Sequence, residues 1–382
     1  IVCIKEISME ELGASVSTTL SSPFGNTVFV SSIDNDHNLT RLLISLSSNH
    51  ILELALDSRK AILVSEGHAA GGVISVATHP TDANTVVTVG ADSLLKIWDL
   101  GDGETSPRVL ETHVLIHAPT CVEFKSDGYE LCVGVEGTDT NGNYAALLIM
   151  KYDPSMRAEI AAGSSDGTCL TTEVKIHNVG VGKVTSIKYS KDSKIIAAAS
   201  EDKKVYLYSV EKGFQSTGNL DEHTCPVSSF DFNATTRYVR TYSGVTSADI
   251  AGGNKVAVRY FDLNVPTRAL AGTEVELSEI PEGERKWVTN SNVIASANAG
   301  CLCLPASGDA VREVVASGDK TIAILSSGAL AAFTTAAAGD IATTTAGKAS
   351  IHSAGSTKAS FLANGKVFSA GSDGTMAIWS VL

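Results

Sequence analysis

The chain has 382 residues, of which 43% are apolar and 19% are charged. This composition excludes intrinsic disorder, which requires low hydrophobicity together with high net charge. Against 29 Lys and Arg residues stand 42 Asp and Glu residues, so the formal net charge is −13. Nucleic-acid binders and proteins held on anionic lipid by charge usually have the opposite sign. We therefore expect no nucleic-acid partner and no membrane partner.

Targeting and cysteine usage indicate a cytoplasmic protein. No run of about 18 apolar residues, the length that a membrane-spanning helix needs, occurs in the sequence. The first residues, 1–6, do not form a signal peptide and include no initiator Met, so we expect a processed chain or part of a longer one. The 7 cysteines lie mostly in apolar runs, which predicts reduced and packed thiols.

Short apolar runs, each separated from the next by a turn cluster, follow one another along the chain. They are rich in Val, Ile and Leu and are bounded by Asp, Asn, Gly and Ser, which is typical of β-strands. No long stretch has the apolar spacing of a helix, so we predict an all-β fold with few helices. The clearest runs are residues 27–31, 42–46, 51–56, 62–64, 85–89, 94–98, 194–199 and 204–208.

An internal repeat with a period of roughly 40 residues indicates a solenoid or a propeller. One copy contains His68, Thr88, Asp92 and Trp98, and the Gly-His pair that opens it precedes a strand at 73–77. The final copy, at the C-terminus, keeps the same spacing: a hydroxyl residue stands four positions before Asp, and Trp stands six positions after it. The residues of this copy are Ser369, Asp373 and Trp379.

Weaker copies of the repeat fall near residues 45–54, 197–208 and 315–325. In the copy at 197–208, Tyr208 occupies the Trp position. His223 stands where the His of a further copy belongs.

These repeats resemble the WD-repeat β-propeller family. The resemblance implies a structural network in which His68 bonds to Asp92 and Thr88, and Thr88 accepts from the Trp98 indole. Each buried polar group would then have a partner, as burial demands. Ser369, Asp373 and Trp379 would form the same network in the last repeat. Because propellers host many unrelated roles, the fold by itself indicates little about function.

The repeat spacing predicts a single propeller over residues 1–382 with about seven four-stranded blades. The last blade has room for only three strands, so we expect residues 1–10 to add the fourth and close the ring. Insertion loops interrupt the pattern at 136–143 and 244–254. The expected blades lie near residues 22–66, 67–112, 113–175, 176–221, 222–275, 283–340 and 348–382.

One part of the chain is similar to a narrower family, the echinoderm-microtubule-associated-protein-like proteins. The similarity lies in residues 51–54, 62–68, 72–80 and 95–99, with "Ala-Thr-His-Pro" at a strand end. It implies a microtubule-associated scaffold in a cytoskeletal or ciliary (axonemal) assembly, with tubulin or axonemal proteins as partners. The implied location is the cytoplasm and cytoskeleton, including the cilium or flagellum.

The chain departs from that family in ways that bear on lattice binding. The 382 residues have room for one propeller rather than a tandem pair, and they show no coiled coil and no basic linker. The acidic balance would also oppose contact with the acidic tubulin surface. An adaptor that reads a peptide or a modified residue in the central mouth of the propeller is therefore the alternative.

Searches for cofactor and metal motifs predict none. The stretch 180–185 lacks the Gly and the Ser or Thr of a phosphate-binding loop. Asp139, Asn141 and Asn143 alternate as in a calcium loop, but Tyr144 and Met150 stand where Gly and Glu are needed. Cys301 and Cys303 have no nearby His, which argues against zinc.

No catalytic centre is expected either. His68, Thr88 and Asp92 could suggest a triad, but the propeller network explains their spacing. Trp287 falls outside a clean repeat and is either a core or a contact residue. We therefore predict a non-enzyme that binds partners through insertion loops, since loops on a rigid scaffold carry function. The candidate contact residues are Thr138, Asp139, Asn141, Asn143, Ser247, Asp249 and Asn254.

Overall fold

The structure, a computed structural model, consists of antiparallel strands with little helix in the residues that it describes. Strands here carry Val, Ile and aromatic residues in short runs, and turns carry the Asp, Asn and Gly between them. The described residues are 30–35, 40–46, 50–58, 61–65, 67–68, 72–101, 107–139, 142–165, 167–177, 179–221, 223, 225–243, 258–266, 270–285, 287, 311–317, 320–325, 329–334, 345–349, 357–371 and 376–380.

The strands form seven sheets, numbered here 1 to 7 in chain order, and in each of them consecutive strands are neighbours. Sheet 1 contains β1 (Val30–Asn35), β2 (Arg41–Leu46), β3 (Ile51–Ala55) and β4 (Ala61–Ser65). Sheet 2 contains β5 (Val73–Thr78), β6 (Thr85–Gly90), β7 (Leu94–Asp99) and β8 (Arg108–Val114). Sheet 3 contains β9 (Ala118–Phe124), β10 (Glu130–Asp139), β11 (Gly142–Tyr152) and β12 (Leu170–His177).

The remaining sheets follow the same plan, except that sheet 7 has three strands. Sheet 4 contains β13 (Val184–Tyr189), β14 (Ile195–Ser200), β15 (Val205–Ser209) and β16 (Gln215–Leu220). Sheet 5 contains β17 (Val227–Phe232), β18 (Tyr238–Ser243), β19 (Val258–Asp262) and β20 (Thr273–Val275). Sheet 6 contains β21 (Val311–Ser317), β22 (Lys320–Leu325), β23 (Leu330–Thr334) and β24 (Thr345–Ala349). Sheet 7 contains β25 (Thr357–Phe361), β26 (Val367–Gly371) and β27 (Met376–Trp379).

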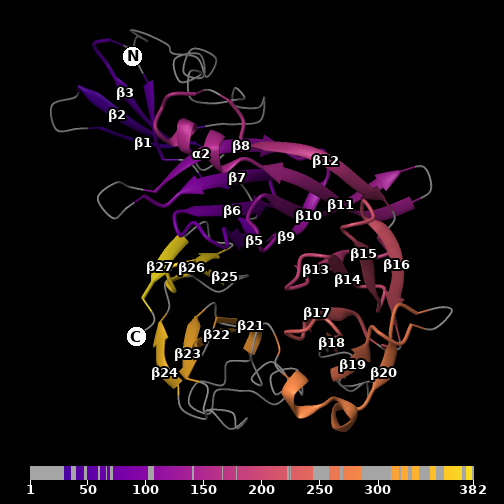
Figure 1. Cartoon of the computed structure of the whole chain (residues 1–382). Coiled ribbons are helices and arrows are strands. Elements are labelled where there is room, and N and C mark those ends of the chain that lie inside the picture. The colour runs from indigo at the N-terminus through magenta and orange to yellow at the C-terminus, as the bar shows by residue number, and fades with distance from the viewer. Residues whose placement is uncertain are drawn as a thin grey trace.

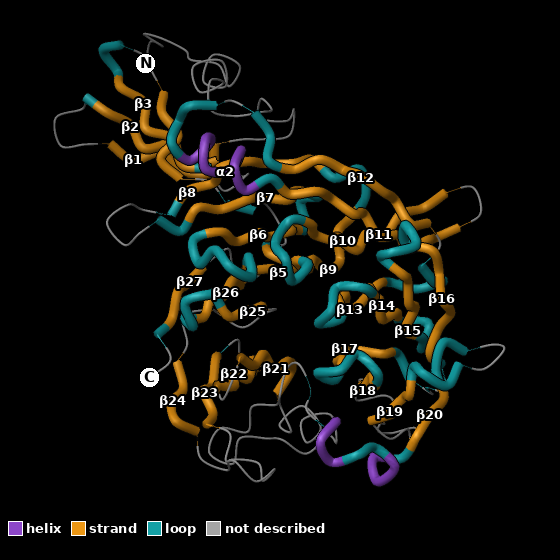
Figure 2. The backbone as a smooth tube through the Cα atoms, in the orientation of Figure 1, coloured by secondary structure: helices purple, strands orange, loops and turns teal. Residues whose placement is uncertain are grey.

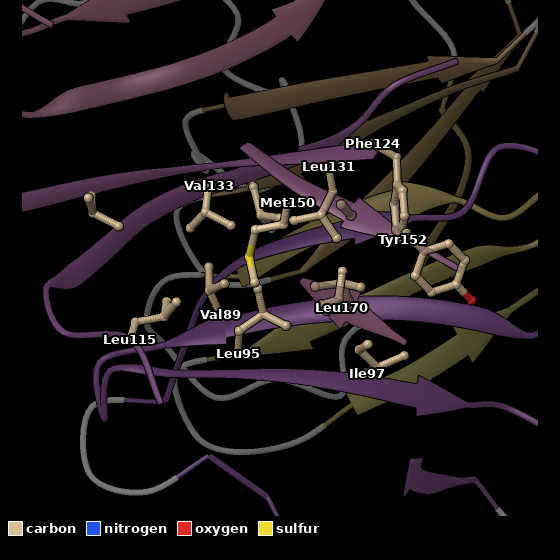
Figure 3. Close-up of a cluster of buried hydrophobic side chains, with 14 of the residues drawn as sticks. Val89, Leu95, Ile97, Leu115, Phe124, Leu131, Val133, Met150, Tyr152 and Leu170 are labelled. Carbon is tan, nitrogen blue, oxygen red and sulfur yellow. The ribbon is translucent and has the colours of Figure 1, made fainter. Parts of the chain in front are cut away.

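The core lies between the faces of neighbouring sheets. Val89, Leu95 and Ile97 of sheet 2 pack against Leu131 and Met150 of sheet 3, and all five are buried (Figure 3). Similar apolar layers join sheets 3 and 4, sheets 4 and 5, and sheets 6 and 7. Fully burying one such side chain contributes about 1.5–3 kcal/mol. Because both faces of a sheet are covered, its central strands are buried at every position rather than at alternate ones, as in the fully buried β6.

Sheets 2 to 7 surround a common centre, with the first strand of each sheet nearest to it (Figure 1). β9 lies beside both β5 and β13, and β13 lies beside β17. At the other side, β25 lies beside β5. The all-β architecture and its repeated four-stranded antiparallel sheets fit a β-propeller.

Sheet 1 differs from the expectation that it would precede sheet 2 in the ring. It lies outside the six other sheets, on the side of β8 and the helix α2 (Figure 2). The physical reason is that sheet 7 packs directly on the face of sheet 2 that does not contact sheet 3. Leu362 and Phe368 of this side pack with Val73, Val86 and Trp98. Residues 1–10, which were expected to complete the last blade, lie outside the described residues.

Two insertions in sheet 3 take forms that the sequence did not indicate. The expected loop at 136–143 is a hairpin, because β10 and β11 stay paired as far as Asp139 and Gly142. The link from β11 to β12 contains α2 (Pro154–Ala161). Asp153 caps α2 by accepting from the backbone N–H groups of its first turn, and Pro154 has the backbone angle that a first helical position requires.

Candidate functional site

The polar residues of the best repeat meet at one end of sheet 2. His68 Nδ1 lies 3.0 Å from Asp92 Oδ1, and His68 Nε2 lies 2.7 Å from Thr88 Oγ1. The indole Nε1–H of Trp98 donates to Thr88 Oγ1 at 2.7 Å. His68 thus contacts Asp92 through one ring nitrogen and Thr88 through the other.

This network is closed, which makes it structural rather than catalytic. The Thr88 hydroxyl is fully buried and is bonded to both His68 and Trp98, so it is not presented to a substrate. Gly90 permits the contact, because a Cβ there would overlap the His68 ring and lie 2.6 Å from Asp92 Oδ1. The resulting chain ties the turn before β7 to the segment before β5.

Parts of the same network recur in other sheets. Trp379 Nε1 donates to the buried Ser369 Oγ at 2.7 Å, whereas Asp373 lies outside the described residues. In sheet 5, His223 Nε2 lies 2.7 Å from Thr241 Oγ1. Burial, with a contribution from the Arg259 charge, lowers the pKa of His223 to about 4. His223 is therefore neutral at pH 7.

Sheet 4 replaces the His with a different donor. Asp202, in the turn after β14, accepts from the Tyr206 hydroxyl at 2.6 Å and from the Val181 backbone N–H at 3.1 Å. Tyr208, which the repeat spacing placed at the Trp position, is buried in the layer between sheets 3 and 4. In the sequence, the feature that accompanies this replacement of His is Tyr206, four residues after Asp202.

Many connections between strands gather at the same end of the sheets. The turns that join second and third strands lie there together with the segments that lead from one sheet to the next. Backbone hydrogen bonds link them: Leu115 to Ser93 at 2.8 Å, Val179 to Ala145 at 3.0 Å and Glu201 to Lys183 at 2.9 Å. We call this end the hairpin end, because the β10–β11 hairpin lies on it.

The hairpin end contains one of the two regions that sequence reasoning selected for contact. Thr138, Asp139 and Asn143 lie in the β10–β11 hairpin. The segment that contains the second set of residues connects β18 to β19, which is again a link between a second and a third strand. Asn141, Ser247, Asp249 and Asn254 themselves lie outside the described residues.

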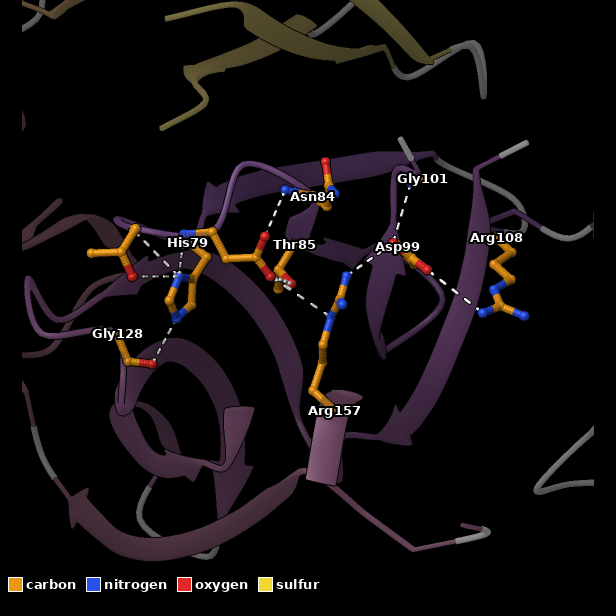
Figure 4. Close-up of polar contacts among 10 residues, drawn as sticks. His79, Asn84, Thr85, Asp99, Gly101, Arg108, Gly128 and Arg157 are labelled. Atoms are coloured by element: carbon orange, nitrogen blue, oxygen red, sulfur yellow. Dashed lines mark hydrogen bonds and ion pairs between the residues drawn. The ribbon is translucent and has the colours of Figure 1, made fainter. Parts of the chain in front are cut away.

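A polar cluster at the opposite end joins α2 to sheet 2 (Figure 4). Arg157 donates to Asp99 Oδ1 at 2.9 Å and its Nε lies 3.8 Å from Asp82 Oδ2. His79 lies beside this cluster, where its Nε2–H donates to Gly128 O at 3.1 Å and its Nδ1 accepts from Asp82 N at 2.9 Å. Burial lowers the pKa of His79, in keeping with the neutral ring.

A Cys, a His and a Glu also meet between sheets 2 and 3, but not as a nucleophilic site. The Cys169 thiol donates to Glu111 Oε2 at 2.8 Å, and His113 contacts the other carboxylate oxygen. Burial opposes ionisation, yet hydrogen bonds from His113, Cys169 and Thr168 lower the pKa of Glu111 to about 2. Burial and the Glu111 charge raise the pKa of the Cys169 thiol, so it stays protonated. A protonated thiol is a poor nucleophile.

Charged side chains line the innermost strands around the centre. Glu123 of β9, Lys188 of β13 and Asp231 of β17 occupy the same position, one residue before the strand ends. Lys188 Nζ lies 3.8 Å from Asp231 Oδ1, and Arg240 Nη2 lies 3.7 Å from Asp231 Oδ2. Burial raises the pKa of Glu123 to about 7, with Lys188 opposing the shift.

Trp287, whose role the sequence left open, is a buried residue. It is 7% exposed and its ring lies 4.6 Å from the guanidinium carbon of Arg240. It also packs beside Tyr260 and forms an isolated bridge with Asn233. Trp287 therefore packs over the buried side chain of Arg240 on sheet 5.

The described residues contain no group of three or more His, Cys, Asp or Glu side chains arranged to hold a metal ion. Among the same residues, no helix has the length and hydrophobicity that crossing a bilayer requires.

Comparison with known protein families identifies WD40 repeats in this chain. The family described as "WD domain, G-beta repeat" matches residues 59–99 and 170–209. Each match covers the last strand of one sheet and the first three strands of the next, β4 to β7 and β12 to β15. The match is consistent with a WD-repeat β-propeller and indicates a protein-interaction scaffold, because WD40 domains mediate protein–protein interactions and are typically non-catalytic.

Proposed function

We propose that this protein is a non-catalytic scaffold associated with microtubules, within a cytoskeletal or ciliary (axonemal) assembly. Tubulin or axonemal proteins would be its partners, and the cytoplasm, with its cytoskeleton and cilia, its location. The similarity of residues 51–99 to microtubule-associated proteins supports this proposal. The observation that carries the scaffold role is that an all-β body gathers many of its connecting segments at the hairpin end.

The blade number belongs to the same proposal. Seven blades with a closing strand from residues 1–10 remain the prediction for the complete propeller. Six sheets surround the centre in the described residues, so a seven-bladed ring would require sheet 1 to enter between sheets 7 and 2.

Co-sedimentation of the purified chain with stabilised microtubules over a salt series tests the proposed partner. A direct contact through local basic groups would place the chain in the pellet at low salt and release it as salt rises, because screening weakens charge pairs. An acidic protein of similar size and charge, run in parallel, controls for trapping. A chain that stays in the supernatant at low salt contradicts autonomous binding to microtubules.

The alternative is an adaptor that binds a peptide or a modified residue in its central mouth. The favouring observation is the set of charged groups on the innermost strands, Glu123, Lys188 and Asp231. The two proposed functions predict different effects of a substitution in these innermost strands. Loss of partner binding on Lys188→Gln with unaltered microtubule pelleting would favour the adaptor.

A further inference from the structure

We propose that the boundary between sheets 2 and 3 at the hairpin end binds an extended peptide segment of a partner protein that carries a carboxylate next to an aliphatic side chain. The proposed surface, called here the Lys175 patch, consists of Val114, Ile116, His117, Tyr144 and Lys175. It deepens the scaffold role proposed above and rests on it.

The cation of this patch is held in place by neutral groups. Lys175 Nζ lies 2.9 Å from His117 Nε2 and 5.5 Å from the centre of the Tyr144 ring. The Tyr144 hydroxyl also lies at His117 Nε2, at 2.8 Å. An ammonium can only donate, so Nε2 is the acceptor in the Lys175 contact and the imidazole is neutral. Among the ion pairs of the described residues, none includes Lys175.

The geometry of the patch is built into the backbone. The His117 and Tyr144 rings meet edge to face, with centroids 5.5 Å apart. A Cβ at Gly137 would lie 2.8 Å from His117 Nδ1 and 2.9 Å from the Tyr144 hydroxyl, so the glycine leaves the space that both rings occupy. A preorganised cation loses little freedom when it binds an anion.

Exposed aliphatic residues stand close to His117 in the chain. Val114 ends β8 and Ile116 immediately precedes His117, and their exposed fractions are 70% and 91%. Exposed aliphatic residues next to the imidazole that holds the ammonium match a ligand with alternating apolar and acidic groups. Because the chain as a whole carries a charge of −13, an acidic ligand would be repelled from most other surfaces and directed to this one.

The adjacent hairpin adds backbone groups to the surface. β10 pairs with β9 only as far as Glu136, and β11 pairs with β12 only from Ala146. Beyond these residues the described parts of the two strands form ladder pairs with each other, and the Val179 N–H also donates to Ala145 O. The edge of β10 after Glu136 therefore has no described partner strand on its outer side. A strand edge of this kind accepts an extended peptide through main-chain hydrogen bonds. The combined features therefore select an extended acidic and aliphatic segment rather than a helix.

The test uses the full chain and a fluorescent, capped peptide that alternates glutamate with leucine, measured by fluorescence anisotropy at low salt. Lys175→Glu should weaken binding by about tenfold or more, since a charge-assisted bond is replaced by repulsion. Ile116→Ser should weaken it severalfold without altering charge. Lys191→Glu, the matched charge reversal at an exposed turn of the opposite end, should leave binding unchanged.

Several outcomes would overturn the proposal. They are absence of binding by the wild-type chain, equal binding of a peptide with glutamine in place of glutamate, or unchanged binding after Lys175→Glu. A second copy of the chain as the occupant would be revealed by a dimer in sedimentation that Ile116→Ser dissociates. Microtubule co-sedimentation is read separately, so its failure with intact peptide binding would contradict only the proposed partner.

Discussion

At the scale of single residues, burial decides which polar groups the fold uses. Thr88 and the His68 ring are buried, and both have complete hydrogen bonding through Asp92 and Trp98. A buried donor without a partner would cost about 1–3 kcal/mol, so the four residues act as a unit. Glu123 differs, because burial disfavours its charged form and raises its pKa to about 7.

The raised pKa of Glu123 predicts a pH-dependent stability. Its folded pKa of about 7 exceeds the ordinary value of 4.5, so the folded state holds the proton more tightly than the unfolded state. The stabilisation is complete below about 4.5 and is lost as the pH rises through about 7. Relative to wild type, Glu123→Gln should gain up to roughly 3 kcal/mol of unfolding free energy between these limits.

Urea denaturation of both proteins from pH 4.5 to pH 8 measures this difference. Glu201→Gln, at an exposed turn, is the control that removes a carboxylate without burial. A constant difference between wild type and Glu123→Gln across the range would show that folding does not raise the pKa of Glu123.

At the scale of elements, α2 illustrates how an insertion becomes part of the packing. The helix is short, and isolated helices of such length are marginal in water. Its attachment to sheet 2 therefore stabilises it, through Arg157 and the two carboxylates that Arg157 contacts, Asp82 and Asp99. The segment after α2 continues the attachment, because Thr168 and Cys169 donate to Glu111 of β8.

Loss of the Arg157 contacts should loosen α2 while leaving the sheets intact. Arg157→Met keeps much of the apolar stem but removes the charged hydrogen bond to Asp99, which should lower the free energy of unfolding by about 1–2 kcal/mol. Amide exchange in residues 153–165 should accelerate at the same time. Lys151→Met, an exposed site on β11, provides the matched control. Unchanged exchange in α2 would mean that its apolar contacts suffice.

At the scale of the whole molecule, the position of sheet 1 is the feature that most affects the architecture. Ile44, Leu52 and Leu54 are buried within sheet 1, whereas Leu43 and Ile62 on its other face are 44% and 57% exposed. The packing of sheet 7 against sheet 2 does not include sheet 1. In the described residues, the apolar layers between these other sheets contain no residue from 30–65.

Removal of residues 1–65 should therefore leave a folded protein. We expect the chain 66–382 to unfold in a single cooperative transition, with a melting temperature within a few degrees of that of the full chain. The reason is that the apolar layers between sheets 2 and 3, 3 and 4, and 4 and 5 are all retained. Circular dichroism and calorimetry measure this. Aggregation or loss of the transition would instead indicate that sheet 1 is a blade of a seven-bladed ring.

The sequence was sufficient to predict the all-β class, the repeat and the residues of the His68 network, because these depend on local patterns. Apolar runs of four to seven residues define strands wherever they lie, and the spacing of Asp92 and Trp98 follows from the geometry of one hairpin. The hairpin at 136–143 was misread as a loop, since its polar and glycine-rich sequence forms strands only through continued pairing with its partner.

Only the tertiary structure decided how the pieces are placed relative to one another. The packing of sheet 7 against the face of sheet 2 around Trp98 is a contact between distant segments, and nothing local in residues 30–65 indicates it. The Lys175 patch likewise joins a residue before β9 to residues in β11 and β12, 27 and 58 positions away. Local sequence patterns determine strands and turns, whereas contacts between distant strands depend on the packing of complete sheets.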